Sequence, residues 1–174
     1  MAILQKLKEH FSRDSVTLDL QDIQALILRS RPEPYVGVHA MLHFDEAAGA
    51  RNLLGRLAPH IASADNWSED LDFWIGAALS FEGLKALGVP DAQLKTFPLP
   101  FQQGMAARAE QLRDFGPNAP ENWEDVFKPG NCHLALTIYA VDDDALDKAL
   151  ATARTELDRS SGVTLLGEHR FGPP

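Results

Sequence analysis

Three histidines lie on two predicted strands, where their imidazoles could act as bases or hold a small ligand. His39 and His43 belong to the segment Tyr35 to Phe44, and His133 belongs to the segment Cys132 to Val141. Imidazole titrates nearest to neutral pH, so it is suited to both tasks. A histidine on a sheet is more often a hydrogen-bonded packing residue, and a binding site needs rings that converge. We therefore treat His39, His43 and His133 as candidate cofactor-binding residues and expect no metal site.

Other motifs that carry chemistry are missing from the sequence. It contains no phosphate-binding loop, no G-x-S-x-G turn and no H-E-x-x-H helix. The acidic runs Glu69-Asp70 and Asp142-Asp143-Asp144 are typical of a solvated loop and a helix cap. Cys132 is expected to be a small buried hydrophobic residue. The motifs alone therefore predict no catalytic residue.

Two strands with chemically different faces would carry the histidines. In both segments the even-numbered residues are apolar, and a strand alternates its side chains between two faces. We expect the even-numbered face to pack on helices and the other face to stay open. The open face would present Tyr35, His39, Met41, His43, His133 and Tyr139. A half-apolar sheet face is seldom left to water, so a second sheet should cover it.

The order of elements predicts a single α+β domain with the ferredoxin-like βαββαβ pattern of a dimeric α+β barrel. The strands are expected at 35–44, 73–79, 132–141 and 163–170. The two long helices are expected at 45–61, capped by Asp45, and at 142–160, capped by Asp142. Residues 22–174 would form the domain. Residues 1–21 would be an amphipathic lead-in with Ile3, Leu4, Leu7 and Phe11 on one face.

A helical insert separates the second and third predicted strands. Ser80 is a suitable N-cap for its first helix, which Gly88 and Pro90 would end. Pro98 and Pro100 favour an extended segment after it. A second helix is then predicted from Gln102 to Phe115, with apolar residues at helical spacing.

The composition argues against some classes of binding partner and some cellular locations. The chain has 174 residues and a formal net charge of −9, which argues against nucleic-acid binding and attachment to an anionic membrane. No apolar run approaches the length of a membrane span. The N-terminus lacks the apolar core of a secretory signal, and one cysteine excludes an internal disulfide. We expect a cytoplasmic protein.

The insert also carries a family resemblance. Residues 76–90 read G-A-A-L-S-F-E-G-L-K-A-L-G-V-P, which resembles the N-I-A-F-T-x-x-G-L-x-A-L-G-L segment of dye-decolorizing (DyP-type) haem peroxidases. Asp22-Ile23-Gln24 is similar to the D-I-Q-G entry of that family, with Ala25 where glycine is usual. The later part of the insert resembles F-x-x-x-F-x-x-G-M-x-x-R-A-x-x-L-x-D-x-G-x-x-A-P-x-x-W at Phe97, Phe101, Gly104, Met105, Arg108, Ala109, Leu112, Asp114 and Gly116 to Trp123.

The resemblance implies the N-terminal domain of such a peroxidase, without the C-terminal half that ligates haem. Members of the family use haem and hydrogen peroxide to oxidise dyes and phenols. Their distal Asp lies in a G-x-x-D-G motif beyond the first domain, and the distal Arg and proximal His come later. This sequence contains no G-x-x-D-G. The resemblance therefore implies a truncated chain that is inactive by itself and binds no haem alone.

Two other functions fit the same residues. The chain could be a stand-alone, non-catalytic binding domain that forms a homodimer through its open sheet face, with a small ligand among the three histidines. It could also be a cofactor-poor enzyme of the dimeric α+β barrel type that uses one histidine as a base. In each case the expected partner is a second copy or a second ferredoxin-like domain.

Overall fold

A four-stranded antiparallel sheet forms the centre of the computed structural model, which describes residues 18–28, 35–66, 68 and 70–172. The strands are β1 (Val36–Phe44), β2 (Phe73–Leu79), β3 (Leu134–Ala140) and β4 (Val163–Phe171). Their spatial order is β2-β3-β1-β4, so β1 and β3 are the inner strands. The predicted ferredoxin-like α+β fold and its central strand pair are confirmed.

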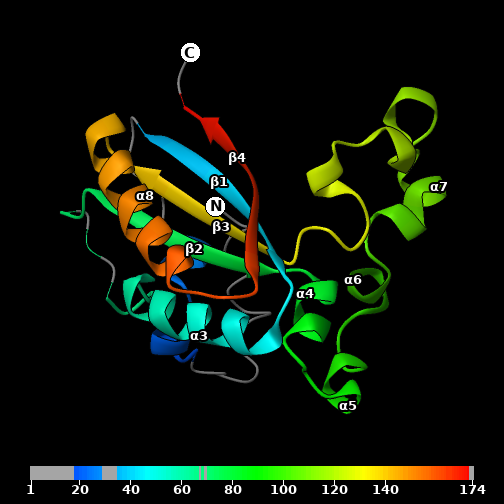
Figure 1. Ribbon diagram of the computed structural model, residues 1–174, viewed down its shortest axis with the longest axis horizontal. Helices are drawn as coiled ribbons and strands as arrows, with labels where there is room; N and C mark the ends of the chain where they lie inside the picture. Colours follow the sequence, from blue (N-terminus) through cyan, green and yellow to red (C-terminus); the bar gives the residue numbers. More distant parts are fainter. Residues whose placement is uncertain (1–17, 29–34, 67, 69, 173–174) are drawn as a thin grey trace, which may run out of the picture.

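Two long helices, α3 (Ala47–Leu57) and α8 (Asp143–Asp158), lie on the same face of the sheet (Figure 1). The even-numbered residues of β1 and β3 point to them, as predicted. Val38 pairs with Ile138, which also pairs with Ile75, and the side chains of Val38 and Ile138 are fully buried. This layer between sheet and helices is the hydrophobic core.

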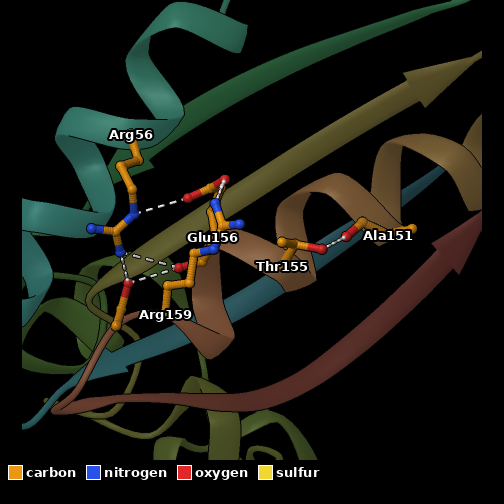
Figure 2. A network of polar contacts seen from close by, with 6 residues as sticks. Arg56, Ala151, Thr155, Glu156 and Arg159 are labelled. Carbon is orange, nitrogen blue, oxygen red and sulfur yellow. Dashed lines mark hydrogen bonds and ion pairs between the residues drawn. The ribbon is translucent and has the colours of Figure 1, made fainter.

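A polar network joins the C-terminal ends of these two helices (Figure 2). Arg56 Nε donates a hydrogen bond to Glu156 Oε2 at 2.8 Å, and Arg159 Nη1 donates to Glu156 Oε1 at 3.1 Å. Arg56 Nη2 also donates to the Glu156 carbonyl at 3.2 Å and to the Ser160 hydroxyl. Because the Glu156 side chain is only 13% exposed, it meets both guanidinium groups in a partly dry setting.

Two of the predicted helix caps are confirmed and one is wrong. Ser80 Oγ accepts a hydrogen bond from the Gly83 backbone N–H at 3.0 Å, and Asp142 Oδ1 accepts one from Ala145 at 2.8 Å. Asp45 does not cap α3. Its Oδ2 instead accepts a hydrogen bond from the Thr164 hydroxyl at 2.8 Å, and α3 begins one residue later without a side-chain cap.

The insert is more fragmented than the sequence predicts. After α4 (Phe81–Ala86) and α5 (Asp91–Leu94) come α6 (Leu99–Gln103), the 3-10 turn η3 (Ala106–Arg108) and α7 (Ala109–Leu112). The extended segment predicted at Pro98 and Pro100 is wrong, because a proline in the first turn of a helix leaves no hydrogen bond unmade. The predicted continuous helix from Gln102 to Phe115 is also wrong. Gly104, at φ 70°, interrupts it.

The insert then returns to the sheet through three short 3-10 turns. These are η4 (Gly116–Asn118), η5 (Pro120–Asn122) and η6 (Asp125–Phe127). In Figure 1 the whole insert lies beside the sheet, at the end where β2 finishes and β3 begins. It is joined to the domain where the chain leaves and re-enters the sheet, and Leu87 at the end of α4 also packs in the hydrophobic core.

The described N-terminal residues lie along β2, an outer strand. They form η1 (Leu20–Asp22) and α2 (Ala25–Leu28), and between them the Gln24 side chain reaches β2. Its Oε1 accepts a hydrogen bond from the Ala77 N–H and its Nε2 donates one to the Ala77 carbonyl, both at 2.8 Å. The Gln24 amide thus replaces a neighbouring strand at this edge. The amphipathic face predicted from Ile3 to Phe11 lies outside the described residues.

Candidate functional site

The sheet face opposite α3 and α8 carries aromatic side chains, as the alternation predicts. Tyr139 lies 5.4 Å from Tyr35 and 5.1 Å from Phe171, measured between ring centroids. All three rings are half-buried. Edge-to-face contacts of this kind stabilise aromatic clusters beyond their buried area.

Two residues predicted on the open face are not open to solvent. Met41 is 6% exposed and His133 is 7% exposed. Met41 lies on an inner strand, so β3 and β4 flank it on both sides. His133 precedes β3, and its ring packs against Phe44 at 5.5 Å. Sequence alternation identifies which side of a strand a residue faces, but not what else lies on that side.

His39 is part of the aromatic cluster. Its ring lies 4.6 Å from Phe171, and its Nδ1 shares a hydrogen bond of 2.9 Å with Thr137 Oγ1. Burial lowers the pKa of His39, and positive charge on the neighbouring His169 lowers it further. His39 is therefore held neutral near physiological pH, in a site made mostly of rings.

His43 and His133 form a stacked pair at the other end of the face. Their ring centroids are 4.2 Å apart with an interplanar angle of 25°. His43 Nδ1 donates a hydrogen bond to the Asn131 carbonyl at 2.7 Å, and its Nε2 lies 3.9 Å from Asp45 Oδ1. His133 Nδ1 accepts a hydrogen bond from the Phe44 backbone N–H at 2.9 Å. Both rings thus tie the start of β3 to β1.

The structure brings together two of the three predicted histidines. His39 lies four residues from His43 along β1, a separation of roughly 13 Å at the usual rise of a strand. Its neighbour across the sheet is His169, which also contacts Phe127 at 5.4 Å. Within the described part of the chain, no group of three or more His, Cys, Asp or Glu side chains is arranged to hold a metal ion.

A large apolar groove lies in the insert, and the sequence reading did not predict it. Its volume is about 870 Å³, and its walls come from the start of α4, from α6 and from the returning segment. Phe81, Phe101, Met105, Trp123 and Phe127 are among the residues that line it. Phe101 packs edge-to-face on Phe81 at 5.9 Å. These residues follow no regular period, since they come from short separate turns, so a search for periodicity passes over them.

Cys132 lines the same groove and is only half-buried, so the prediction of a buried cysteine is wrong. The returning segment places it at the wall of the groove, two residues before β3 begins. Burial raises the pKa of the Cys132 thiol, while a hydrogen bond to the Leu42 backbone opposes the rise. The thiol is therefore protonated and weakly nucleophilic at neutral pH.

A membrane-spanning segment is not found among the helices of the described residues: each is too short or too polar to cross a bilayer.

The comparisons with known proteins agree on one family. Residues 48–170 match the family described as the DyP dimeric alpha+beta barrel domain. No curated protein sequence matches the chain.

Solved structures with the same fold include an ancestral D-type dye decolorizing peroxidase, which is 23% identical with a TM-score of 0.76 over 90% of this chain and 35% of that one. A fungal DyP-type peroxidase from Auricularia auricula-judae is 21% identical, with a TM-score of 0.73 over 92% of this chain and 35% of that one. DyP2 from Amycolatopsis sp. is 23% identical, with a TM-score of 0.72 over 87% and 32%. The chain therefore spans about a third of the length of these proteins.

Proposed function

Because the chain belongs to the family of DyP dimeric alpha+beta barrel domains, we propose that it works as the N-terminal structural half of a dye-decolorizing peroxidase. In this role it supplies one sheet of a closed barrel, and a second ferredoxin-like domain supplies the other. The peroxide-driven oxidation of dyes or phenols belongs to the complete protein. The chain by itself is inactive.

The aromatic sheet face carries this proposal. Tyr35, Tyr139 and Phe171 leave apolar ring surface on the side of the sheet opposite α3 and α8. Surface of this kind is typical of an interface rather than of a solvated face. A second sheet packed about 10 Å away would bury these rings between two layers.

The histidines predicted to bind a cofactor do not fit haem in this chain. An axial ligand needs a free imidazole nitrogen that points into a space large enough for the macrocycle. His133 Nδ1 accepts a hydrogen bond from the Phe44 N–H and its ring is buried, and the His39 ring is packed against Phe171. The His43 ring is stacked on His133, with Nδ1 bound to the Asn131 carbonyl and Nε2 3.9 Å from Asp45 Oδ1. The large groove is lined by other residue types, with no histidine among them. We therefore place the haem ligands outside this chain and derive no chemical step through haem here.

Two further parts of the proposal concern the limits and the location of the domain. We propose residues 22–174 as the folded unit, preceded by a lead-in of residues 1–21. A cytoplasmic location is supported by the single cysteine, since disulfides are the usual staple of secreted domains.

Haem titration and sedimentation test the proposal together. We expect the purified chain to give no Soret band with peroxide turnover, and to self-associate with rising concentration through its aromatic face. Phe171→Asp should abolish this association, because a carboxylate would be desolvated in the interface. Phe115→Asp is the matched control, since Phe115 is 59% exposed in the insert, away from the sheet.

Two results would contradict the proposal. Peroxide turnover by the haem-loaded chain would show that it is active alone. Equal association of Phe171→Asp and wild-type chains would show that the aromatic face is not an interface.

A further inference from the structure

His133 joins three parts of the molecule through its backbone. Its N–H donates to the Leu42 carbonyl of β1 at 2.9 Å, and its carbonyl accepts a hydrogen bond from the Ser80 N–H at 3.0 Å. Ser80 is the N-cap of α4, the first helix of the insert. Gly83, in the first turn of α4, packs so closely that an added Cβ would lie 2.1 Å from the His133 oxygen. His133 therefore holds the returning end of the insert between β1 and the start of α4, while Leu87 separately anchors α4 in the hydrophobic core.

The His133 ring can keep its place only while it is neutral. Nδ1 must present a lone pair to the Phe44 N–H, 2.9 Å away in a buried site. Protonation would put two N–H donors against each other, and the ring would have to move. Burial lowers the pKa of His133, and charge on the stacked His43 lowers it further. A backbone hydrogen bond to Gly130 and the carboxylates of Glu82 and Asp45 act in the opposite direction.

His43 differs from its partner, because it can accept a proton without losing its hydrogen bond. Its Nδ1 already donates to the Asn131 carbonyl, and a proton on Nε2 would face Asp45 Oδ1 at 3.9 Å. A positive charge on His43 opposes a proton on the His133 ring, which is stacked 4.2 Å away.

We propose that the stacked pair is an acid-sensitive latch: protonation of His133 releases residues 130–133, the returning end of the insert, from β1, while the sheet and α4 stay in place. Gly130 and Cys132 line the apolar groove, so release of this segment opens one of its walls. The latch depends on two hydrogen bonds in which the histidine rings have opposite roles. The ring of His133 accepts a backbone hydrogen bond, and the ring of His43 donates one.

Cys132 is the single cysteine of the chain and directly precedes the latch, so it is a built-in reporter. We would measure its rate of labelling by 4,4′-dithiodipyridine from pH 7.5 to 5, relative to the denatured chain at the same pH. Below 6.5, the ordinary histidine pKa, the relative rate should rise above its neutral-pH value, by at most about tenfold per pH unit, until the pKa of the closed state is passed. Far-ultraviolet circular dichroism should stay constant over this range.

Three variants separate the latch from a general loss of structure. His133→Asn keeps an acceptor near the position of Nδ1 but cannot titrate, so its relative labelling should not change with pH. His43→Asn keeps a donor for Asn131 and removes the opposing charge, so opening should begin at a higher pH. His60→Asn, at an exposed histidine after α3, should behave as wild type.

The proposal is overturned if wild-type labelling relative to the denatured chain is constant over the range. It is also overturned if His133→Asn is as acid-sensitive as wild type. Should His133→Asn fail to fold, a nuclear magnetic resonance titration of the wild-type chain gives the same answer. The Phe44 amide must then lose its protection from hydrogen exchange at the pH where the His133 ring titrates. If amide exchange and the His133 ring signal change at different pH values, the latch is refuted.

Discussion

At the scale of single residues, Gly83 packs closely against the backbone of His133. Gly83 lies in the first turn of α4, where a side chain would normally be tolerated. Here an added Cβ would lie 2.1 Å from a carbonyl oxygen that belongs to the entry into β3. A glycine is required at this position by the approach of two backbones, rather than by an unusual φ angle.

Gly83→Ala should therefore destabilise the protein by roughly 2–3 kcal/mol, because α4 and the His133 backbone must separate. Gly55→Ala provides the matched control. Gly55 lies within α3 with no atom within 4 Å of an added Cβ, so alanine should stabilise by about 0.5–1 kcal/mol. Urea unfolding measures both changes. Equal effects of the two substitutions would contradict the contact with His133.

For single residues, the types and spacing predicted which positions matter, but not which partners they contact. The resemblance of Asp22-Ile23-Gln24 to a family motif marked the segment, but only the fold shows that the Gln24 amide pairs with both backbone groups of Ala77. The histidines were found from their types and alternation. Their division into a pair and a separate ring depends on the path of the returning segment, which no local pattern encodes.

At the scale of elements, regular strands and long helices were predictable, and the insert was only partly so. Strand alternation and the Asp142 cap rest on local chemistry that the sequence shows directly. The helix predicted from Gln102 to Phe115 failed at Gly104, whose positive φ outweighs the apolar spacing around it. Short turns take their shape from what they pack against, and that information lies elsewhere in the chain.

The link between α3 and α8 gives a prediction at this scale. Glu156→Gln removes the charge that faces Arg56 and Arg159, so we expect a loss of about 1–2 kcal/mol in the free energy of unfolding. Glu82→Gln is the control. Its ion pair with Lys85 is half-exposed on both sides, so the loss should stay below about 0.5 kcal/mol. Unfolding at low and high salt measures both, and equal losses would contradict a special role for the network in Figure 2.

At the scale of the whole molecule, the pKa values of two histidines couple stability to pH. Burial is the main cause that lowers the pKa of both His39 and His133. Below pH 6.5 the unfolded chain therefore binds protons that the folded protein does not. Stability should be unaffected by these groups well above 6.5 and should fall as the pH drops from 6.5 to the lowered pKa values.

Urea midpoints between pH 8 and 5, at constant ionic strength, check this dependence. The wild-type midpoint should fall with acid, and the fall should be smaller in His39→Asn and in His133→Asn. A midpoint that is flat below pH 6.5 would show that neither histidine resists protonation in the folded state.

The spatial order of the strands has a consequence for how the chain is made. In the described sheet β1 lies between β3 and β4, and β2 pairs with β3, so the first two strands to be synthesised are never neighbours. No strand pair of this sheet can form on the ribosome until β3 has emerged, after the whole insert. Until then, the edges of two apolar strands remain unpaired, and chains in this state are prone to aggregation. Folding of this domain is therefore timed by its second half, however early its first strands are made.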